Sequence, residues 1–407
     1  MVTVMTKTRS FALFALFAVS VATESAAAAT GAFDHGHAGF VFSDIRFALT
    51  DAQQAQCPHG LSLNVEQIFA KTPEGRRRRG ESDKDYAERL NAGAAKVSTA
   101  ANGDNTCANP AAAGPDPYAQ TVDAPDAIAE GIDIDAHLKM LGIAPRPQAC
   151  PHDELLGADG RRGIDNQFYR AVGCTHAFQS GGPANSFATE MLTGSWGILL
   201  TLDGVDDPVN DDAVEVGIYA NADPIMLSAD RKPLDFATYA IDQNPAFRTK
   251  TTGIIKDGKL YTKPVDVRIH DVVNGMHLER YLRDAVIEAT LSPDGEVSGV
   301  LAGYAPVSTL YDNKFGYSAG KDGAGQPANP RLILGTANGA ARVLGYTCPG
   351  IYYALKHFAD GHPDPKTGEC TSISMQFFFK AIPAFVVDVK TRSTNDRIEK
   401  GSNGGRR

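Results

Sequence analysis

Residues 253–262 read Gly-Ile-Ile-Lys-Asp-Gly-Lys-Leu-Tyr-Thr, and this stretch predicts a β-hairpin. Asp257-Gly258 lies between two short runs in which apolar residues alternate. Both central positions of such a two-residue turn need a positive φ, which Gly adopts freely and Asp tolerates. This part of the chain is therefore expected to form antiparallel β-structure.

Further strands are predicted on both sides of this hairpin. Apolar runs rich in β-forming residues cover 196–202 and 213–220, and another hairpin is expected from 285–301, with its turn at 292–295. Residues 276–288 fit a helix and a strand, because their apolar residues satisfy both periods. Residues 372–389 predict a pair of strands or one long bent strand.

Hairpins at this spacing favour a mainly β fold, namely an antiparallel β-sandwich or barrel-like domain over residues 150–390. The preceding residues 30–149 are expected to form an irregular, partly helical N-terminal region. Within it, 71–130 has a linker-like composition, contains the run Arg76-Arg77-Arg78-Arg79, and predicts one short helix around 83–95. The basic residues 391–407 are expected to be a disordered tail.

Residues 1–29 predict a secretory signal peptide. Lys7 and Arg9 precede a largely apolar stretch of 12 residues, and small residues follow it. Twelve residues are fewer than the roughly 20 that a membrane-spanning helix needs, although an uncleaved signal anchor remains the alternative. The next apolar stretch, 377–389, is interrupted by Lys380 and Pro383. We therefore expect a periplasmic or secreted protein with no membrane span in the mature chain.

The chain contains six cysteines, an even number that predicts three disulfides in an exported protein. Pairing between sequence neighbours is our expectation, that is 57–107, 150–174 and 348–370, out of 15 possible connectivities. No C-x-x-C or C-x-x-C-H occurs, which argues against a zinc ribbon, a redox motif and haem. The cysteines are Cys57, Cys107, Cys150, Cys174, Cys348 and Cys370.

The net charge of −9 argues against nucleic acid as a partner, since an acidic body repels phosphate backbones. The motifs G-x-x-x-x-G-K-[ST] and G-x-G-x-x-G before a helix are absent, so we expect no nucleotide cofactor. The 48 Asp and Glu residues offer too many possible carboxylate pairs for a catalytic pair to be chosen.

The candidate metal site is an acidic loop between the runs 196–202 and 213–220. Repulsion among its carboxylates would be relieved by a hard cation, and Ca²⁺ takes six to eight oxygen ligands. The alternative is a solvated loop whose charges discourage pairing between sheet edges. The predicted calcium ligands are Asp203, Asp206, Asp207, Asp211 and Asp212.

Other polar segments are weaker candidates for metal sites. Residues 153–167 and 360–369 are rich in oxygen ligands, but ordinary turn chemistry explains them as well. His35-x-His37 has a spacing that copper or zinc sites use on a strand. We expect an exported ligand-binding protein whose partner is an unknown small molecule or glycan. The alternative is a secreted, carboxylate-dependent hydrolase or lyase, assisted by calcium.

Overall fold

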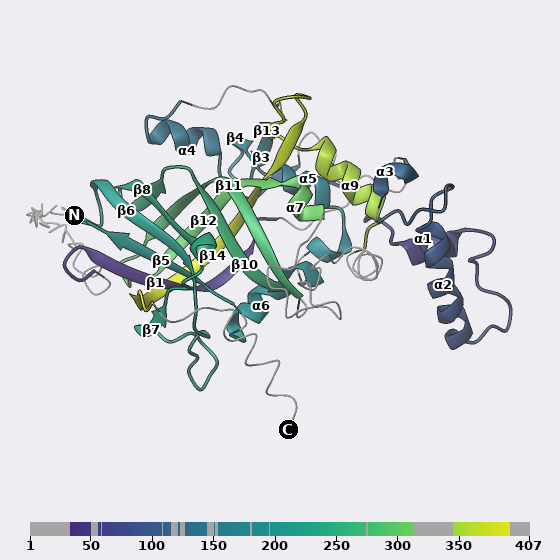
Figure 1. Ribbon diagram of the computed structural model, residues 1–407, viewed down its shortest axis with the longest axis horizontal. Coiled ribbons are helices and arrows are strands. Elements are labelled where there is room, and N and C mark those ends of the chain that lie inside the picture. The colour runs from purple at the N-terminus through teal and green to yellow at the C-terminus, as the bar shows by residue number, and fades with distance from the viewer. Residues whose placement is uncertain are drawn as a thin grey trace, which may run out of the picture.

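The computed structural model describes twelve segments of the chain, which exclude the predicted signal peptide and the predicted tail. Its centre is a closed barrel of eight antiparallel strands, in which the last strand pairs with the first (Figure 1). The described residues are 33–49, 56–57, 59–107, 109–114, 121–122, 127–144, 150, 154–179, 181–194, 196–273, 276–311 and 345–390. The barrel strands, in spatial order, are β1 (His37–Phe47), β5 (Ile198–Asp203), β6 (Asp211–Ala220), β8 (Arg248–Lys256), β9 (Lys259–Thr262), β11 (Met276–Leu291), β12 (Val297–Pro306) and β14 (Cys370–Val387). This confirms the mainly β, barrel-like prediction.

The predicted hairpins form the barrel wall. β8 and β9 meet at Asp257-Gly258, whose φ angles are 52° and 72°, as the tight turn requires. Residues 276–291 form one long strand, because β10 (Val265–Val273) pairs with its first half and β9 and β12 flank its second half. These pairings show that the strand, and not the helix, is the structure of this segment.

Aromatic side chains fill the barrel. The rings of Phe42 and Phe379 stack with centroids 4.4 Å apart, and Phe47 lies 5.1 Å from Phe377. All four are at most 3% exposed. Burial of each such side chain contributes about 1.5–3 kcal/mol, so the interior is a packed core.

Short elements cover the outside of the barrel. Helix α4 (Ile134–Met140) places Ile134 and Leu138 on Val286 and Val300 of the wall. On β14, Ser374 and Gln376 form part of a buried polar row that faces outward, and Gln376 hydrogen-bonds the backbone of 132 and 165. This row joins the N-terminal region to the barrel through side-chain-to-backbone contacts.

The remaining elements extend this arrangement. β7 (Ala237–Ala240) pairs in parallel with the end of β14, and β13 (Gly361–Pro363) pairs with its start. A separate sheet contains β2 (Ile128–Ala129), β3 (Leu155–Gly157) and β4 (Arg162–Ile164). The other helices are α1 (Val65–Lys71), α2 (Asp83–Val97), α3 (Pro110–Ala113), α5 (Gln167–Val172), α6 (Ser186–Leu192), α7 (Val307–Tyr311) and α9 (Cys348–His357).

All six cysteines form disulfides, but the predicted pairing of neighbours is wrong. The bonds join Cys57 to Cys174, Cys107 to Cys348, and Cys150 to Cys370, across 117, 241 and 220 residues. The reason is topological: closure of the barrel brings the C-terminal β14 beside β1, so early and late segments meet. Three disulfides and no free cysteine indicate an oxidising, non-cytoplasmic compartment. Among the described helices, none has the length and apolar composition for crossing a membrane.

Candidate functional site

Helices α1 and α2 form an antiparallel hairpin that projects away from the barrel (Figure 1). We call residues 64–99 the helical arm. Layered between the arm and the barrel are α5 and α9, which contact each other and β14. The arm is thus the part of the described chain that reaches farthest out at this end.

The base of the arm is covalently fastened on both sides. Cys57, before the arm, is bonded to Cys174 just after α5, and Cys107, after the arm, is bonded to Cys348 at the start of α9. The Ser62 amide also donates to the Cys174 carbonyl at 2.7 Å. The arm therefore projects from a cross-linked base.

Local sequence accounts for the helices of the arm. Asn64 and Gln67 form a reciprocal capping box at the start of α1, and Ser82 caps α2 by accepting from the Asp85 amide. Phe69 packs where α2 has Gly93; a Cβ at Gly93 would lie 2.1 Å from the Phe69 ring. The absence of a side chain at position 93 lets the two helices approach.

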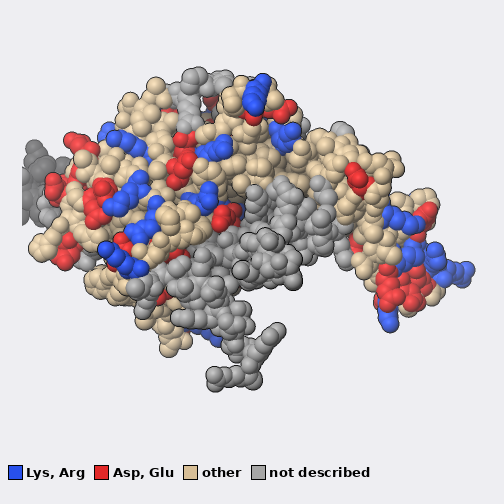
Figure 2. All heavy atoms as spheres, in the orientation of Figure 1, with Lys and Arg blue, Asp and Glu red and all other residues tan. Residues whose placement is uncertain are grey.

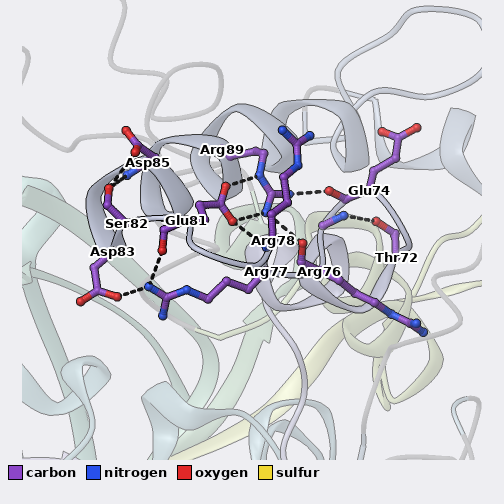
Figure 3. A network of polar contacts seen from close by, with 11 residues as sticks. Thr72, Glu74, Arg76, Arg77, Arg78, Glu81, Ser82, Asp83, Asp85 and Arg89 are labelled. Carbon is purple, nitrogen blue, oxygen red and sulfur yellow. Dashed lines mark hydrogen bonds and ion pairs between the residues drawn. The ribbon is translucent and has the colours of Figure 1, made fainter.

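The loop between the helices is held by Arg89 of α2. Its guanidinium binds both carboxylate oxygens of Glu81 at 2.8 Å, and it also donates to the backbone carbonyls of Glu74 and Arg76. Figure 3 shows these contacts converging on Glu81 and Arg89. The second Glu81 oxygen also accepts from the Arg78 amide at 2.9 Å, so one ion pair orders most of the loop.

We call the Arg89–Glu81 ion pair the clamp. A second set of contacts surrounds it. Arg77 donates to the Glu81 carbonyl at 3.1 Å and pairs with Asp83. The guanidinium carbons of Arg77 and Arg89 lie 5.4 and 5.3 Å from the centre of the Tyr86 ring. Stacking of two arginines on one ring restricts the side chains that position the loop.

The ion pair shifts the ionisation of its members. The hydrogen bonds from the Arg89 side chain and then the Arg78 backbone lower the pKa of Glu81 from 4.5 to about 2. The hydrogen bond to Glu81 in turn raises the pKa of Arg89. Both groups are therefore charged throughout the physiological range.

Pairing of the acids leaves basic groups unmatched on the loop. Glu81 binds Arg89, Asp83 binds Arg77, and Glu74 binds Lys96 at 3.2 Å. The loop between α1 and α2 has three more arginines, and all three are exposed. Their guanidinium groups make no hydrogen bond or ion pair with the described part of the chain. They are Arg76, Arg78 and Arg79, which we call the arginine tip (Figure 2 shows basic groups gathered at this end of the molecule).

Comparison with known proteins gives no match. The chain matches no family model, no curated protein and no solved structure.

The predicted calcium residues lie in and beside the β5–β6 loop, where several of their carboxylates bind protein groups. Asp211 accepts from the amides of Asp206 and Ala213 at 2.7 and 2.9 Å. Burial raises the pKa of Asp211, but these backbone hydrogen bonds outweigh it and the pKa lies below its usual value. Asp207 accepts from the Val209 amide at 2.8 Å, and Asp203 pairs with His37.

Asp212 makes no contact of this kind within the described residues. Across the described segments, no group of three or more His, Cys, Asp or Glu side chains is placed to hold a metal ion. His35 and His37 do not converge either, because His35 pairs with Asp34 at 3.5 Å while His37 faces Asp203. Calcium binding by the acidic loop stays a prediction.

The other two oxygen-rich segments come together on the outside of β14. Asn166 is fully buried and donates to the carbonyls of Ala48 and Glu130, while Asp165 accepts from the Ile134 amide. Asp360 accepts from the Ser374 amide at 2.6 Å. These residues hold backbone segments in place, in accord with the ordinary turn and capping roles considered from the sequence.

His362 of the segment 360–369 faces Asp284 of β11. His362 Nε2 lies 2.9 Å from a carboxylate oxygen of Asp284, and the φ angles of these two residues are 51° and 48°. Nearby, Asp266 accepts hydrogen bonds from the Tyr281 hydroxyl and the Asp284 amide. Burial, and then the Asp266 hydrogen bond, raises the pKa of Tyr281. Left-handed backbone at two facing non-glycine residues is a form of strain that concentrates at functional sites.

A small pocket lies at one end of the barrel. Its lining includes Glu279, Tyr281, Leu310 and Met375, and its volume of about 10 Å³ is near that of one water molecule. Arg280 also lines it, with its guanidinium 5.1 to 5.9 Å from the ring centres of three phenylalanines, Phe47, Phe187 and Phe377. The pocket is too small for a ligand in this conformation.

Sequence reasoning noted the arginine run and the short helix but missed the clamp. Glu81 and Arg89 are eight residues apart, a spacing that no helical pair rule favours. The sequence signal that could have indicated this ion pair is Ser82. As the capping residue of α2, it places Glu81 just before the helix. A reversal of the chain there lets Glu81 reach back to the helix.

Proposed function

We propose that this protein is an exported binding protein, periplasmic or secreted, whose arginine tip binds an acidic glycan. The observation that supports the proposal is the set of exposed guanidinium groups on a loop whose acids are already paired. Guanidinium groups match carboxylate and sulfate oxygens in a fork geometry. An arm with this tip can present them to an extended anionic chain.

Order in the loop strengthens this proposal. A flexible arginine segment loses conformational entropy on binding, whereas the Arg89–Glu81 clamp holds the backbone of 74–81 before any ligand arrives. The arm is one of two places where basic residues gather in the sequence, the other being residues 391–407. A glycan also fits the oxidising compartment that the three disulfides indicate.

The test compares retention on dextran sulfate with retention on neutral dextran. Glutamine at Arg76, Arg78 and Arg79 removes three charges and leaves the clamp intact. An exposed ion pair contributes up to about 1 kcal/mol, so we expect about a ten- to hundredfold weaker affinity for dextran sulfate. Retention on neutral dextran should be absent for both proteins.

The matched control removes three charges from exposed positions elsewhere: Lys259→Gln, Lys263→Gln and Lys366→Gln. We expect this variant to bind dextran sulfate like the wild type. Equal losses in both triple variants would show that the arm has no special role. The Arg89→Gln variant should lose more affinity than Arg76→Gln, because it also releases the loop.

A second candidate, a carboxylate-dependent hydrolase or lyase, is supported by the His362–Asp284 pair. An imidazole nitrogen that lies 2.9 Å from a carboxylate oxygen is an arrangement suited to proton transfer. The proposal predicts release of reducing ends or unsaturated products from an acidic polysaccharide, abolished by Asp284→Asn with dextran sulfate binding retained. Absence of products from the wild type across carboxylated and sulfated polysaccharides would exclude this candidate.

A further inference from the structure

The arginine tip presents an accessible peptide bond as well as three charges. Arg79 and Gly80 are exposed, and they are the central residues of a turn that the Glu81 amide closes by donating to the Arg78 carbonyl at 3.1 Å. Gly80 has a φ of 78°, and a Cβ at this position would meet no atom within 4 Å. The space beside the bond between Arg79 and Gly80 is therefore open, at a loop tip of the kind that proteases prefer to cut.

The backbone of the tip is bound at alternate residues. The clamp holds the carbonyls of Glu74 and Arg76 and the amide of Arg78. Among the described residues, the backbone groups of Arg77 and Arg79 have no hydrogen-bond partner. An extended peptide binds along an exposed strand edge of its partner through such main-chain groups. The loop thus leaves free the backbone groups that a protease needs in order to hold this segment.

The free arginines have a fixed relation to the same bond. Counted back from it, Arg79 is first, Arg78 is second and Arg76 is fourth, whereas Arg77, the third, is bound to Asp83 (Figure 3). A carboxylate in the first pocket of a serine protease selects a basic residue directly before the cut, and further carboxylates select arginine by the same fork geometry. No other bond in the sequence is preceded by arginine at all three of these positions.

We propose that the arginine tip is a processing site, cut after Arg79 by an endoprotease with acidic pockets for arginine. The amide bond between Arg79 and Gly80 breaks, and water gives its hydroxyl to the Arg79 carbonyl carbon and its remaining hydrogen to the Gly80 nitrogen. This inference goes beyond the binding of a glycan and does not depend on it, because the protease reads the arginines and the backbone directly.

Both products of this cut stay in one molecule. β1 precedes the cut and lies between β5 and β14 in the barrel, and Cys57, also before the cut, is bonded to Cys174 after it. The other two disulfides lie wholly after Gly80. Cleavage therefore gives two chains that separate only when the bond from Cys57 to Cys174 is reduced in denaturant.

A second pair of arginines shows why exposure alone does not define the site. Arg161 and Arg162 are also exposed, but the side chain of Arg161 pairs with Asp159 at 2.6 Å. The Arg161 amide donates to Asp159 at 3.0 Å, and its carbonyl accepts from the Gly157 amide at 2.7 Å. This backbone is already paired within its own hairpin and is not available to a protease.

The experiment is limited digestion of the full chain with a proprotein convertase of the subtilisin class, followed by mass spectrometry. The wild type is expected to be cut after Arg79 and to run as one band without reductant and two bands with it. Arg79→Gln and Arg76→Gln should each slow cleavage about tenfold or more, because each removes a charge-assisted contact with the enzyme. Arg77→Gln should not slow it, since this side chain is bound to Asp83.

The matched control is Arg161→Gln, the same change at an exposed arginine outside the arm, which should be cut like the wild type. The proposal is overturned if the convertase cuts first at another bond, or if Arg77→Gln slows cleavage as much as Arg76→Gln does. It is also overturned if the protein recovered from its native host contains no chain that begins at Gly80.

Discussion

Alanine at Gly93 should destabilise the helical arm, the reverse of its usual effect in a helix. Gly→Ala in a helix interior ordinarily stabilises by about 1 kcal/mol. Here the added Cβ would lie 2.1 Å from the ring of Phe69, so the ring or the helix has to move. Overpacking costs about 1–3 kcal/mol, and a contact of 2.1 Å places this site at the upper end, about 2–3 kcal/mol. Subtraction of the gain in helix propensity leaves an expected net loss of about 1–2 kcal/mol.

The assay is a double-mutant cycle with Phe69→Ala. Removal of this buried ring alone should cost about 3–5 kcal/mol, and in that background Gly93→Ala should stabilise by about 1 kcal/mol. The coupling would then be about 2–3 kcal/mol, measured by hydrogen exchange of residues 65–97 and by chemical denaturation. If Gly93→Ala stabilises the wild-type arm, the close approach of α1 and α2 is refuted.

Three further predictions concern the disulfides, the clamp and the acidic loop. Serine at Cys107 and Cys348 should lower the free energy of unfolding by about 2–5 kcal/mol in non-reducing denaturation and leave the other two bonds formed, as mass mapping of linked peptides would show. Because the folded-state pKa of Glu81 is lowered from 4.5 to about 2, its stabilisation of the loop is complete above pH 4.5 and is lost as the pH falls toward 2. Arg89→Gln should raise that pKa in a carboxyl NMR titration, and an unchanged value would contradict the clamp. If the acidic loop binds calcium, a hundredfold excess over Kd should add about 2.7 kcal/mol to stability, with Asp211→Asn removing most of it, whereas identical melting in Ca²⁺ and EDTA would exclude the site.

The features that could be predicted from the sequence are local ones. Asp257-Gly258 determined a hairpin because both residues can adopt a positive φ and the flanking runs alternate. The helix predicted around 83–95 is α2, which spans Asp83–Val97 and begins after the capping residue Ser82. In each case the signal lies within a few residues of the structure that it specifies.

Tertiary structure alone decided which distant segments meet. Alternation of apolar residues predicts that one face of a strand is buried, but it does not identify the neighbouring strand. The sequence therefore fits a sandwich and a barrel equally well. The pairing of β14 with β1 in the structure decides for the barrel. The same applies to the disulfide of Cys107 with Cys348 and to the pair of Asp284 with His362. Such contacts depend on how the whole chain closes on itself, because their energy is gained only after long loops have been ordered.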